Sequence, residues 1–264
     1  MNRVMPMIAD PNETVETYCR NWDGVTPYAR ATIVHTEGMT AAKAGAKAVV
    51  TVAGDLIGWI GGGCIRGAVM RAARQALETA TPQLIRVRPK EQITATHDPD
   101  GVALHASGCP SKGCAEIFIE PVMPKPPLVI IGTNQIARFL AAFGASLHFE
   151  IVASDGRSQD PDWTRHPRLE GGFIVIATQG AGDIQALTSA LRGDASYVAF
   201  IGSRAKAQAL RERLVAEGIS EGALARMRSP AGLDIGARTA SEIAISILAE
   251  LISVRRSREK SGAS

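Results

Sequence analysis

Short apolar runs alternate with helical patterns along this chain, and the two halves of the sequence combine them differently. In the first half, the pattern predicts a helix at 14–21 and strands at 29–35, 48–52, 56–60, 83–88 and 115–121. A longer helix is predicted to begin near Cys64, because apolar residues recur at helical spacing from Ile65 to Leu77. This order indicates a mixed α+β domain.

The second half opens with a continuous apolar run that ends in glycine, Leu128-Val129-Ile130-Ile131-Gly132. Helices are then predicted at 135–143, 183–191 and 206–216, and strands at 148–153, 172–177 and 197–201. Strands that are apolar throughout and separated by helices are typical of a parallel sheet buried on both faces. The sequence therefore predicts an α/β protein whose second domain is Rossmann-like.

Four prolines within residues 121–127 mark the boundary between the halves, because proline interrupts helices and central strands. We predict a first domain at 1–120, a proline-rich linker at 121–127, a second domain at 128–254 and a basic flexible tail at 255–264. A capping box at Thr239 and Glu242 predicts the start of the last helix, whose apolar stripe ends at Val254.

The composition narrows the class of protein. Of 264 residues, 45% are hydrophobic and 21% are charged, which is typical of a globular protein. The net charge is only +3 and aromatic residues are few, so nucleic-acid binding is not expected. Residues 1–10 lack the pattern of a secretory signal, and no apolar run is long enough to span a membrane. We expect a cytoplasmic location, with the four cysteines kept as thiols.

Three consecutive glycines lead into a cysteine where a strand gives way to the long helix. Gly61, Gly62 and Gly63 leave the backbone accessible to a ligand. The unpaired N–H groups and the dipole of a helix start favour phosphate or thiolate, and Cys64 occupies that start. Arg66 and Arg71 add positive charge nearby, and a guanidinium can bind phosphate through two hydrogen bonds. The alternative is a tight turn in which Cys64 is a small buried apolar residue.

The turn after the first strand of the second domain resembles a dinucleotide-binding loop. Gly132 follows the strand, Ala137 stands at the third glycine position, and Asp155 follows the second strand, where an acidic residue contacts a ribose. Asn134 replaces the second glycine, which normally lets the backbone approach pyrophosphate, so tight NAD or FAD binding is doubtful. The alternative is a Rossmann-like sheet whose nucleotide site has lapsed.

Two further loops of the second domain carry candidate ligand contacts. Gly202, Ser203 and Arg204 offer a small anion pocket at a helix start, although we prefer an ordinary capped turn. Asp234 and Arg238 lie in a glycine-rich loop that either lines the crevice at the carboxyl ends of the strands or is rigidified by an Asp–Arg pair.

Four segments taken together resemble the XdhC/CoxI family of molybdoenzyme accessory proteins, and the resemblance covers nearly the whole chain. The first three are His35-Thr36-Glu37-Gly38 with Ala44-Gly45-Ala46, the glycine-cysteine segment from Gly61 to Gly67, and Gly108-Cys109-Pro110 through to Pro121. The fourth and most specific comprises Phe200 to Arg204, Ser229 to Thr239 and Ser241 to Ala244.

This resemblance implies a protein that binds the molybdenum cofactor, guards it during sulfuration and delivers it to an apo-enzyme of the xanthine dehydrogenase or carbon monoxide dehydrogenase type. Cys64 is then the first candidate for contact with the cofactor, its metal or its sulfur, and Cys109 is the second. Gly61–Gly63 would form the cradle. The expected partners are the apo-molybdoenzyme, a cysteine desulfurase and a second copy of the chain in a homodimer.

Departures from the family pattern affect both domains. Relatives often have an acidic residue where Arg66 stands, and often place histidines after Thr178, which are missing here. Together with Asn134, the missing histidines weaken a nucleotide or metal role for the second domain. Cys114 is an added cysteine, either a redox partner of Cys109 or, as we favour, a strand residue. The spacing of Cys109 and Cys114 argues against a structural zinc site.

Three functions remain open at this level, and we favour a non-catalytic cofactor carrier. The alternative is a flavin- or NAD(P)-binding oxidoreductase that acts in molybdenum cofactor assembly. The third is a binding module without a cofactor of its own. Asn134 separates the first two, because tight flavin or NAD(P)H binding despite this residue would favour the enzyme.

Overall fold

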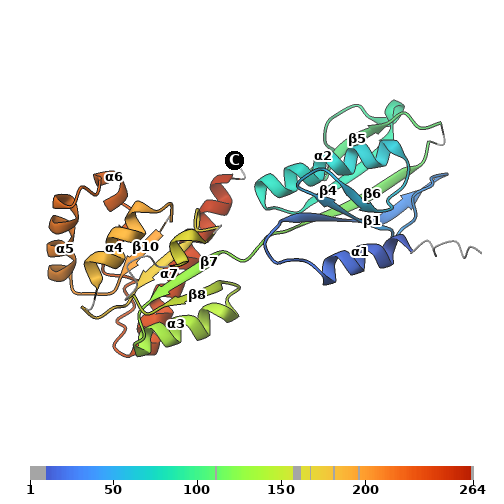
Figure 1. Ribbon diagram of the computed structural model, residues 1–264. Coiled ribbons are helices and arrows are strands. Elements are labelled where there is room, and N and C mark those ends of the chain that lie inside the picture. The colour runs from blue at the N-terminus through green and yellow to red at the C-terminus, as the bar shows by residue number, and fades with distance from the viewer. Residues whose placement is uncertain are drawn as a thin grey trace, which may run out of the picture. The chain divides into compact units, whose positions relative to one another are not determined.

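The computed structural model describes residues 10–110, 112–156, 162–166, 168–180, 182–195 and 197–262 (Figure 1). The chain divides into two compact units, of which the first extends to Pro124 and the second runs from Lys125 to Arg258. The first unit contains a mixed sheet with helices, and the second contains an all-parallel sheet. The predicted α/β class with a Rossmann-like second domain is therefore confirmed.

The first unit is built on a six-stranded sheet with the strand order β3-β2-β1-β6-β4-β5. Its strands are β1 (Tyr28–Glu37), β2 (Lys47–Thr51), β3 (Leu56–Gly58), β4 (Gln83–Pro89), β5 (Ala103–Ser107) and β6 (Cys114–Val122). All neighbouring strands are antiparallel except β4 and β5, which are parallel. A 3₁₀ turn at Lys90–Gln92 follows β4.

Helix α2 (Gly63–Thr79) covers one face of this sheet, and α1 (Pro11–Arg20) packs on the other (Figure 1). The buried side of α2 consists of small or branched apolar residues: Ile65, Ala68, Val69, Ala72, Ala73 and Ala76. They meet the inward-facing positions of four strands, among them Ala31, Ile33, Val50, Ile85, Ile117 and Ile119. Because strand side chains alternate between faces, the neighbouring positions Tyr28 and Val49 face α1 through Val15.

The second unit is a five-stranded parallel sheet with the order β11-β10-β9-β7-β8. Its strands are β7 (Pro127–Ile131), β8 (Glu150–Ser154), β9 (Phe173–Ile176), β10 (Tyr197–Phe200) and β11 (Met227–Arg228). Counted along the chain, this is the 2-1-3-4-5 order of a doubly wound sheet. The strand order therefore reverses between β7 and β9, which is the position where such sheets bind their ligands.

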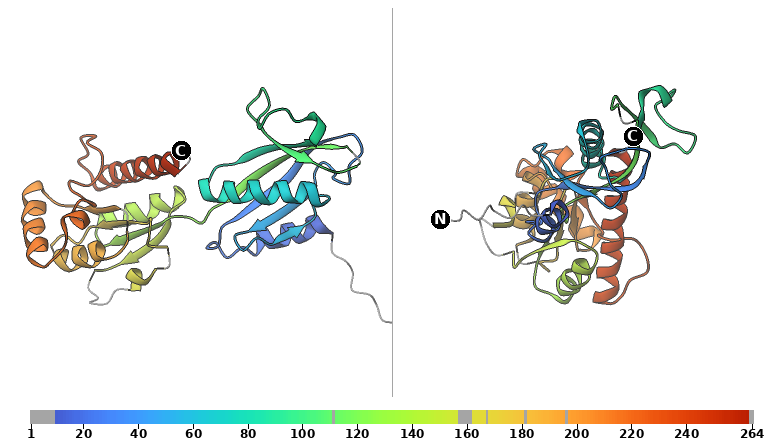
Figure 2. Two further views of the ribbon diagram at one scale, coloured as in Figure 1. Left: turned by 90° about the horizontal axis from the view of Figure 1, so that it is seen from above. Right: turned by 90° about the vertical axis from the view of Figure 1, so that its right-hand side faces the viewer.

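Helices cover both faces of the parallel sheet (Figure 2). Helices α3 (Gln135–Ser146) and α7 (Ala240–Gly262) pack on one face, and α4 (Asp183–Arg192), α5 (Arg204–Ala216) and α6 (Glu221–Leu224) pack on the other. In β7, Leu128 and Ile130 face the first layer, whereas Val129 and Ile131 face the second. This two-sided burial explains why the strands are apolar throughout. A 3₁₀ turn at Asp162–Arg165 precedes β9.

The segment between the two sheets is shorter than the proline-rich linker expected from the sequence. Strand β6 includes Pro121 and ends at Val122, and β7 begins at Pro127, so residues 123–126 separate the strands. Pro121 is tolerated in β6 because it pairs with Ala29 of β1 beyond the point, at Ile119, where the pairing with β4 ends.

Helix α7 continues beyond Val254, through the basic residues predicted to form a flexible tail, and ends at Gly262. Arg255 donates a hydrogen bond to the carbonyl oxygen of Leu147 at 3.2 Å, and its guanidinium carbon lies 4.9 Å from the centre of the Phe149 ring. These contacts hold the basic turn against the second unit, and arginine is a good helix former. The last predicted tail residues, 263 and 264, lie outside the described residues.

Gly132 permits the close approach of β7 and β9 that positions the loops of the second unit. Its φ angle is +135°, and a Cβ atom there would lie 2.3 Å from the carbonyl oxygen of Ala177. We expect Gly132→Ala to lower the free energy of unfolding by roughly 2–4 kcal/mol through backbone strain and steric overlap. The measurement is urea denaturation of the purified variant.

Gly222→Ala is the matched control, because a Cβ at Gly222 would meet no described atom within 4 Å and the residue lies in α6. Its free energy of unfolding should stay within about 1 kcal/mol of wild type. Equal effects of the two substitutions would contradict the steric explanation.

Candidate functional site

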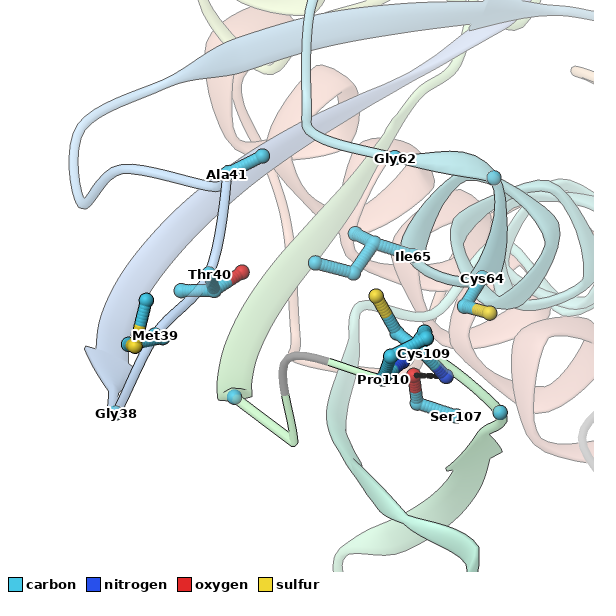
Figure 3. A pocket seen from close by; sticks show the side chains of 13 residues that line it. Gly38, Met39, Thr40, Ala41, Gly62, Cys64, Ile65, Ser107, Cys109 and Pro110 are labelled. Atoms are coloured by element: carbon cyan, nitrogen blue, oxygen red, sulfur yellow. Dashed lines mark hydrogen bonds between the residues drawn. The ribbon is translucent and has the colours of Figure 1, made fainter.

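A cavity of about 910 Å³ opens in the first unit where three loops meet (Figure 3). One wall is the loop Gly38–Ala41 after β1, a second is the start of α2 at Gly62–Ile65, and the third is Ser107–Pro110 after β5, together with Gly113. None of the described residues that line the cavity carries a charged side chain. The cavity therefore offers backbone groups, thiols and apolar surface to a ligand.

The three glycines before α2 have different roles. Gly61 has a φ angle of +107°, and a Cβ there would lie 3.2 Å from the Cβ of Ala42. The fold therefore requires glycine at this position. By contrast, a Cβ on Gly62 or Gly63 would meet no described atom within 4 Å. Gly62 is the N-cap of α2 and has no side chain to cap it, so N–H groups of the first turn have no partner within the helix. The two later glycines leave these N–H groups accessible from the cavity.

Two cysteines from separate loops line this cavity. Cys64 lies in the first turn of α2 and Cys109 in the loop after β5, and both are exposed (Figure 3). The backbone N–H of Cys109 donates to the hydroxyl oxygen of buried Ser107 at 3.2 Å, which orients the loop. The exposure of Cys64 contradicts the alternative in which it is a buried apolar residue. Cys114 is half-buried at the start of β6 and is not among the residues that line the cavity.

Close backbone packing holds the wall opposite α2. Met39 and Lys112 form an isolated β-bridge, and a Cβ on Gly113 would lie 2.5 Å from the carbonyl oxygen of Met39. The pairing of β1 with β6 brings these segments together, because it ends with Glu37 opposite Cys114. The side chain of Met39 is 80% exposed beside the cavity. Sequence reasoning missed this wall because its position depends on strand register.

Arg66, the predicted anion contact, is exposed on the first turn of α2 but is not among the residues that line the cavity. Of the residues proposed for the first unit, the structure therefore brings Gly62, Gly63, Cys64 and Cys109 to one cavity. Gly61 does not line the cavity, but its tight packing against Ala42 and Ile65 holds the backbone that leads into α2.

In the second unit, Asn134 bridges the switch point of the sheet. Its side-chain oxygen accepts a hydrogen bond from the N–H of Ala137 at 3.0 Å and thereby caps α3. Its side-chain NH₂ group donates to the carbonyl oxygen of Ala177 at 2.7 Å. These bonds join the turn after β7, which contains Gly132, to the residue that follows β9. The position of the missing glycine is thus used for a structural contact, and Asp155 lies exposed directly after β8.

A buried carboxylate at the start of α4 binds the next loop along the sheet, which follows β9. The side chain of Asp183 is 5% exposed, pairs with Lys206 and accepts hydrogen bonds from the Thr178 hydroxyl and, at 3.1 Å, from the Gly180 N–H. Burial raises the pKa of Asp183, but the bonds from Lys206, Thr178 and Gly180 outweigh this effect and lower the pKa below its usual value. The Thr178 hydroxyl and the Gly180 N–H therefore already bind an anion, which is the carboxylate of Asp183.

Gly202 and Ser203 have structural roles that favour the capped-turn interpretation. A Cβ on Gly202 would lie 2.4 Å from the ring of Phe200, so the residue must be small. The hydroxyl of Ser203 accepts a hydrogen bond from the N–H of Lys206 at 3.2 Å and caps α5. Arg204 is the first residue of that helix and is exposed.

Asp234 and Arg238 are both exposed in the loop before α7. Within the described ranges no ion pair joins them, so the predicted Asp–Arg pair does not rigidify this loop. The Arg238 N–H donates instead to a carboxylate oxygen of Glu242 at 2.8 Å, and the N–H of Gly232 donates to Glu250 at 2.7 Å. The predicted capping box is present, since Glu242 also accepts from the Thr239 N–H at 2.9 Å and donates its own N–H to the Thr239 hydroxyl.

The part of the chain that the structure describes contains neither a cluster of metal ligands nor a membrane-spanning helix. No group of three or more His, Cys, Asp or Glu side chains in these ranges is arranged to hold a metal ion. Among the helices described, none is long and apolar enough to cross a membrane.

The fold and the cavity define a two-unit protein that combines a glycine-cysteine pocket with a Rossmann-like sheet. A family model for the XdhC Rossmann domain matches residues 128–251, and a model for the XdhC and CoxI family matches residues 22–88. The chain belongs to the XdhC and CoxI family.

The comparisons also found one curated relative and one solved structure that are similar to this chain. The uncharacterized protein YqeB of Escherichia coli (strain K12) is 31% identical over 248 residues, which cover 87% of this chain and 44% of YqeB. The chain thus spans less than half of the length of this curated relative. A crystal structure described as a xanthine dehydrogenase from Bacillus halodurans aligns with a TM-score of 0.45 and 21% identity, covering 95% of this chain and 97% of that one.

The ion pair of Asp183 generates a prediction about stability. Asp183→Asn should lower the free energy of unfolding at pH 7 by roughly 1–3 kcal/mol, because Lys206 loses its charged partner. The pKa of Asp183 is lower in the folded protein than its ordinary value of 3.8, so the carboxylate stabilises the fold fully above that value. Its contribution disappears as the pH falls through the lowered pKa.

The measurement is urea denaturation of both proteins at pH 7 and at several values below pH 4. The difference between wild type and Asp183→Asn should shrink as the solution is acidified. Asp194→Asn, at an exposed position, is the control and should match wild type at pH 7. A difference between wild type and Asp183→Asn that stays constant with pH would contradict the role given to the carboxylate.

Proposed function

We propose that this protein binds the molybdenum cofactor in the cavity of the first unit and assists its sulfuration and insertion into an apo-molybdoenzyme of the xanthine dehydrogenase or carbon monoxide dehydrogenase type. The observation that carries the proposal is the convergence of two cysteines and a glycine-lined helix start on one cavity. Membership of the XdhC and CoxI family supports it.

The residues present suit such a ligand. The cofactor, when bound, supplies a molybdenum ion held by the dithiolene sulfurs of an organic phosphate. The thiols of Cys64 and Cys109 are soft donors that suit a metal–sulfur group. Gly62 and Gly63 leave the first N–H groups of α2 accessible to an anion. The cavity volume of about 910 Å³ falls within the usual range of ligand pockets.

Each part of the cavity has a separate task in this proposal. Cys64 and Cys109 present thiols from two independent loops, so both can contact one ligand. Ser107 holds the backbone of Cys109, and the tight packing at Gly113 keeps the opposite wall in place. The buried apolar side chain of Ile65 would reduce the access of water to an oxidisable group on its side of the cavity.

The alternative function, a flavin- or NAD(P)-binding oxidoreductase, gains no support from the second unit. Asn134 uses the switch point for two hydrogen bonds of its own, and Asp183 engages the donors of the neighbouring loop. We therefore propose a carrier without catalytic activity of its own. Its partners would be the apo-molybdoenzyme, a cysteine desulfurase and a second copy of the chain, in the cytoplasm.

The test of this function is the molybdenum and pterin content of protein isolated from cells that make the cofactor. Wild type should contain the cofactor in a near-stoichiometric amount, and Cys64→Ser should retain about a tenth or less, since one soft ligand is lost. Cys109→Ser should have a smaller loss of the same kind. Molybdenum is measured by metal analysis and pterin by the fluorescence of its oxidised form.

Cys114→Ser is the matched control, because Cys114 lies in the same sequence segment as Cys109 but is not among the residues that line the cavity. It should retain the wild-type content. A wild-type protein without molybdenum but with bound flavin or nucleotide would overturn the carrier proposal. Equal losses in all three variants would overturn the assignment of the site.

A further inference from the structure

The cavity contains no charged side chain among its described lining residues, although the proposed ligand bears a phosphate. A positive charge that binds this phosphate must therefore come from a side chain beside the cavity. The sequence predicted Arg66 and Arg71 as sources of this charge, and neither belongs to the described lining of the cavity. The second of these arginines, the exposed Arg71, lies on α2 about two helical turns beyond Cys64 and on the same side of the helix.

Arg71 folds back along α2 toward the cavity. Its Nη1 atom lies 3.6 Å from the position that a Cβ would take on Gly67, so the missing side chain of Gly67 leaves room for the guanidinium. Gly67 is three residues beyond Cys64, about 4.5 Å along the helix axis. In the part of the chain that the structure describes, Arg71 has no hydrogen bond or ion pair. Its charge is available to an anion one helical turn beyond the Cys64 thiol.

His105 lies on β5, on the strand face that is turned toward α2. Ala103, His105 and Ser107 share one face of this strand, and Ala103 packs against the core that α2 forms with the sheet. Ser107 lines the cavity, so His105 lies one same-face position beyond it, about 6.6 Å along the strand. Burial, and to a lesser extent the positive charge of Arg71, lower the pKa of His105 below its ordinary value. At neutral pH the imidazole is therefore uncharged and retains one N–H donor.

We propose that Arg71 and His105 form a phosphate subsite that continues the cavity and takes the phosphate or pyrophosphate group of the bound ligand. The guanidinium would grip two phosphate oxygens, and the imidazole would donate a hydrogen bond to the same group. The ligand's reactive end would then lie toward Cys64 and Cys109, one helical turn away. The identity of the whole ligand rests on the proposed function, whereas the phosphate chemistry rests on the placement of these two residues.

The test uses inorganic pyrophosphate as the probe and the full chain in its ligand-free form. Isothermal titration calorimetry compares wild type with Arg71→Gln, Arg66→Gln and Arg74→Gln. Arg71→Gln should weaken pyrophosphate binding about fivefold to tenfold, and the other two variants should stay within about twofold of wild type. Arg74 is the matched control, because it lies on the same helix but lines a different cavity with Val52 and Glu78.

Two further measurements separate a specific contact from a general effect of charge. Arg71→Lys keeps the charge without the two-pronged geometry and should bind with intermediate affinity, which also covers the case in which Arg71→Gln fails to fold. The imidazole resonances of His105 in wild type should shift when pyrophosphate is added. Equal weakening by all the glutamine variants, a larger effect at Arg66, unmoved His105 resonances, or no binding by wild type at millimolar pyrophosphate would each overturn the subsite.

Failure of this inference can be told apart from failure of the proposed function. Full retention of molybdenum cofactor by Arg71→Gln would overturn the subsite and leave the carrier function standing. Pyrophosphate binding that depends on Arg71, in a protein that never contains molybdenum, would leave the subsite standing and overturn the carrier function.

Discussion

The packing of α2 against the sheet of the first unit is the constraint on which the rest of the site depends. Ala68, Ala72, Ala73 and Ala76 are small enough for the helix to lie close to β1, β4 and β6, and they are completely or almost completely buried. This close contact fixes the start of the helix beside the loop after β5. Cys64 and Cys109 can line one cavity only while that contact holds. Arg71 and His105 depend on it too, because one lies on the helix and the other on the edge strand.

The second unit has the general form of a nucleotide-binding sheet. At its switch point, however, side chains of the protein itself form the hydrogen bonds that a ligand would otherwise form. In a doubly wound sheet, the loops at the carboxyl ends of the strands normally present unpaired N–H groups to a ligand. Here Asn134 and Asp183 take up those donors and acceptors. Such contacts favour a rigid sheet, and they explain why the fold of this unit is a weak guide to a ligand.

Much of the fold could be predicted from the sequence, because periodicity reports which side of an element is buried. The apolar run at Leu128–Ile131 and the stripe of α2 are examples. The short strand β5 has little such signal, since Ala103–Ser107 contains alanine, histidine and serine at the edge of the sheet. The glycine-cysteine start of α2 was recognisable from local pattern. The loop Gly38–Ala41 was not, because its place follows from strand register. Arg71 was predicted as a nearby positive charge, but the path of its side chain back over Gly67 required the structure.

The central claim is that the ligand lies in the cavity between Cys64 and Cys109, and anomalous X-ray diffraction at the molybdenum absorption edge tests it most directly. Crystals of protein isolated with its cofactor would give the position of the metal without any substitution. We expect a molybdenum peak inside this cavity, within bonding or contact distance of one of the two thiols. A peak at the carboxyl ends of β7 and β9 in the second unit would contradict it.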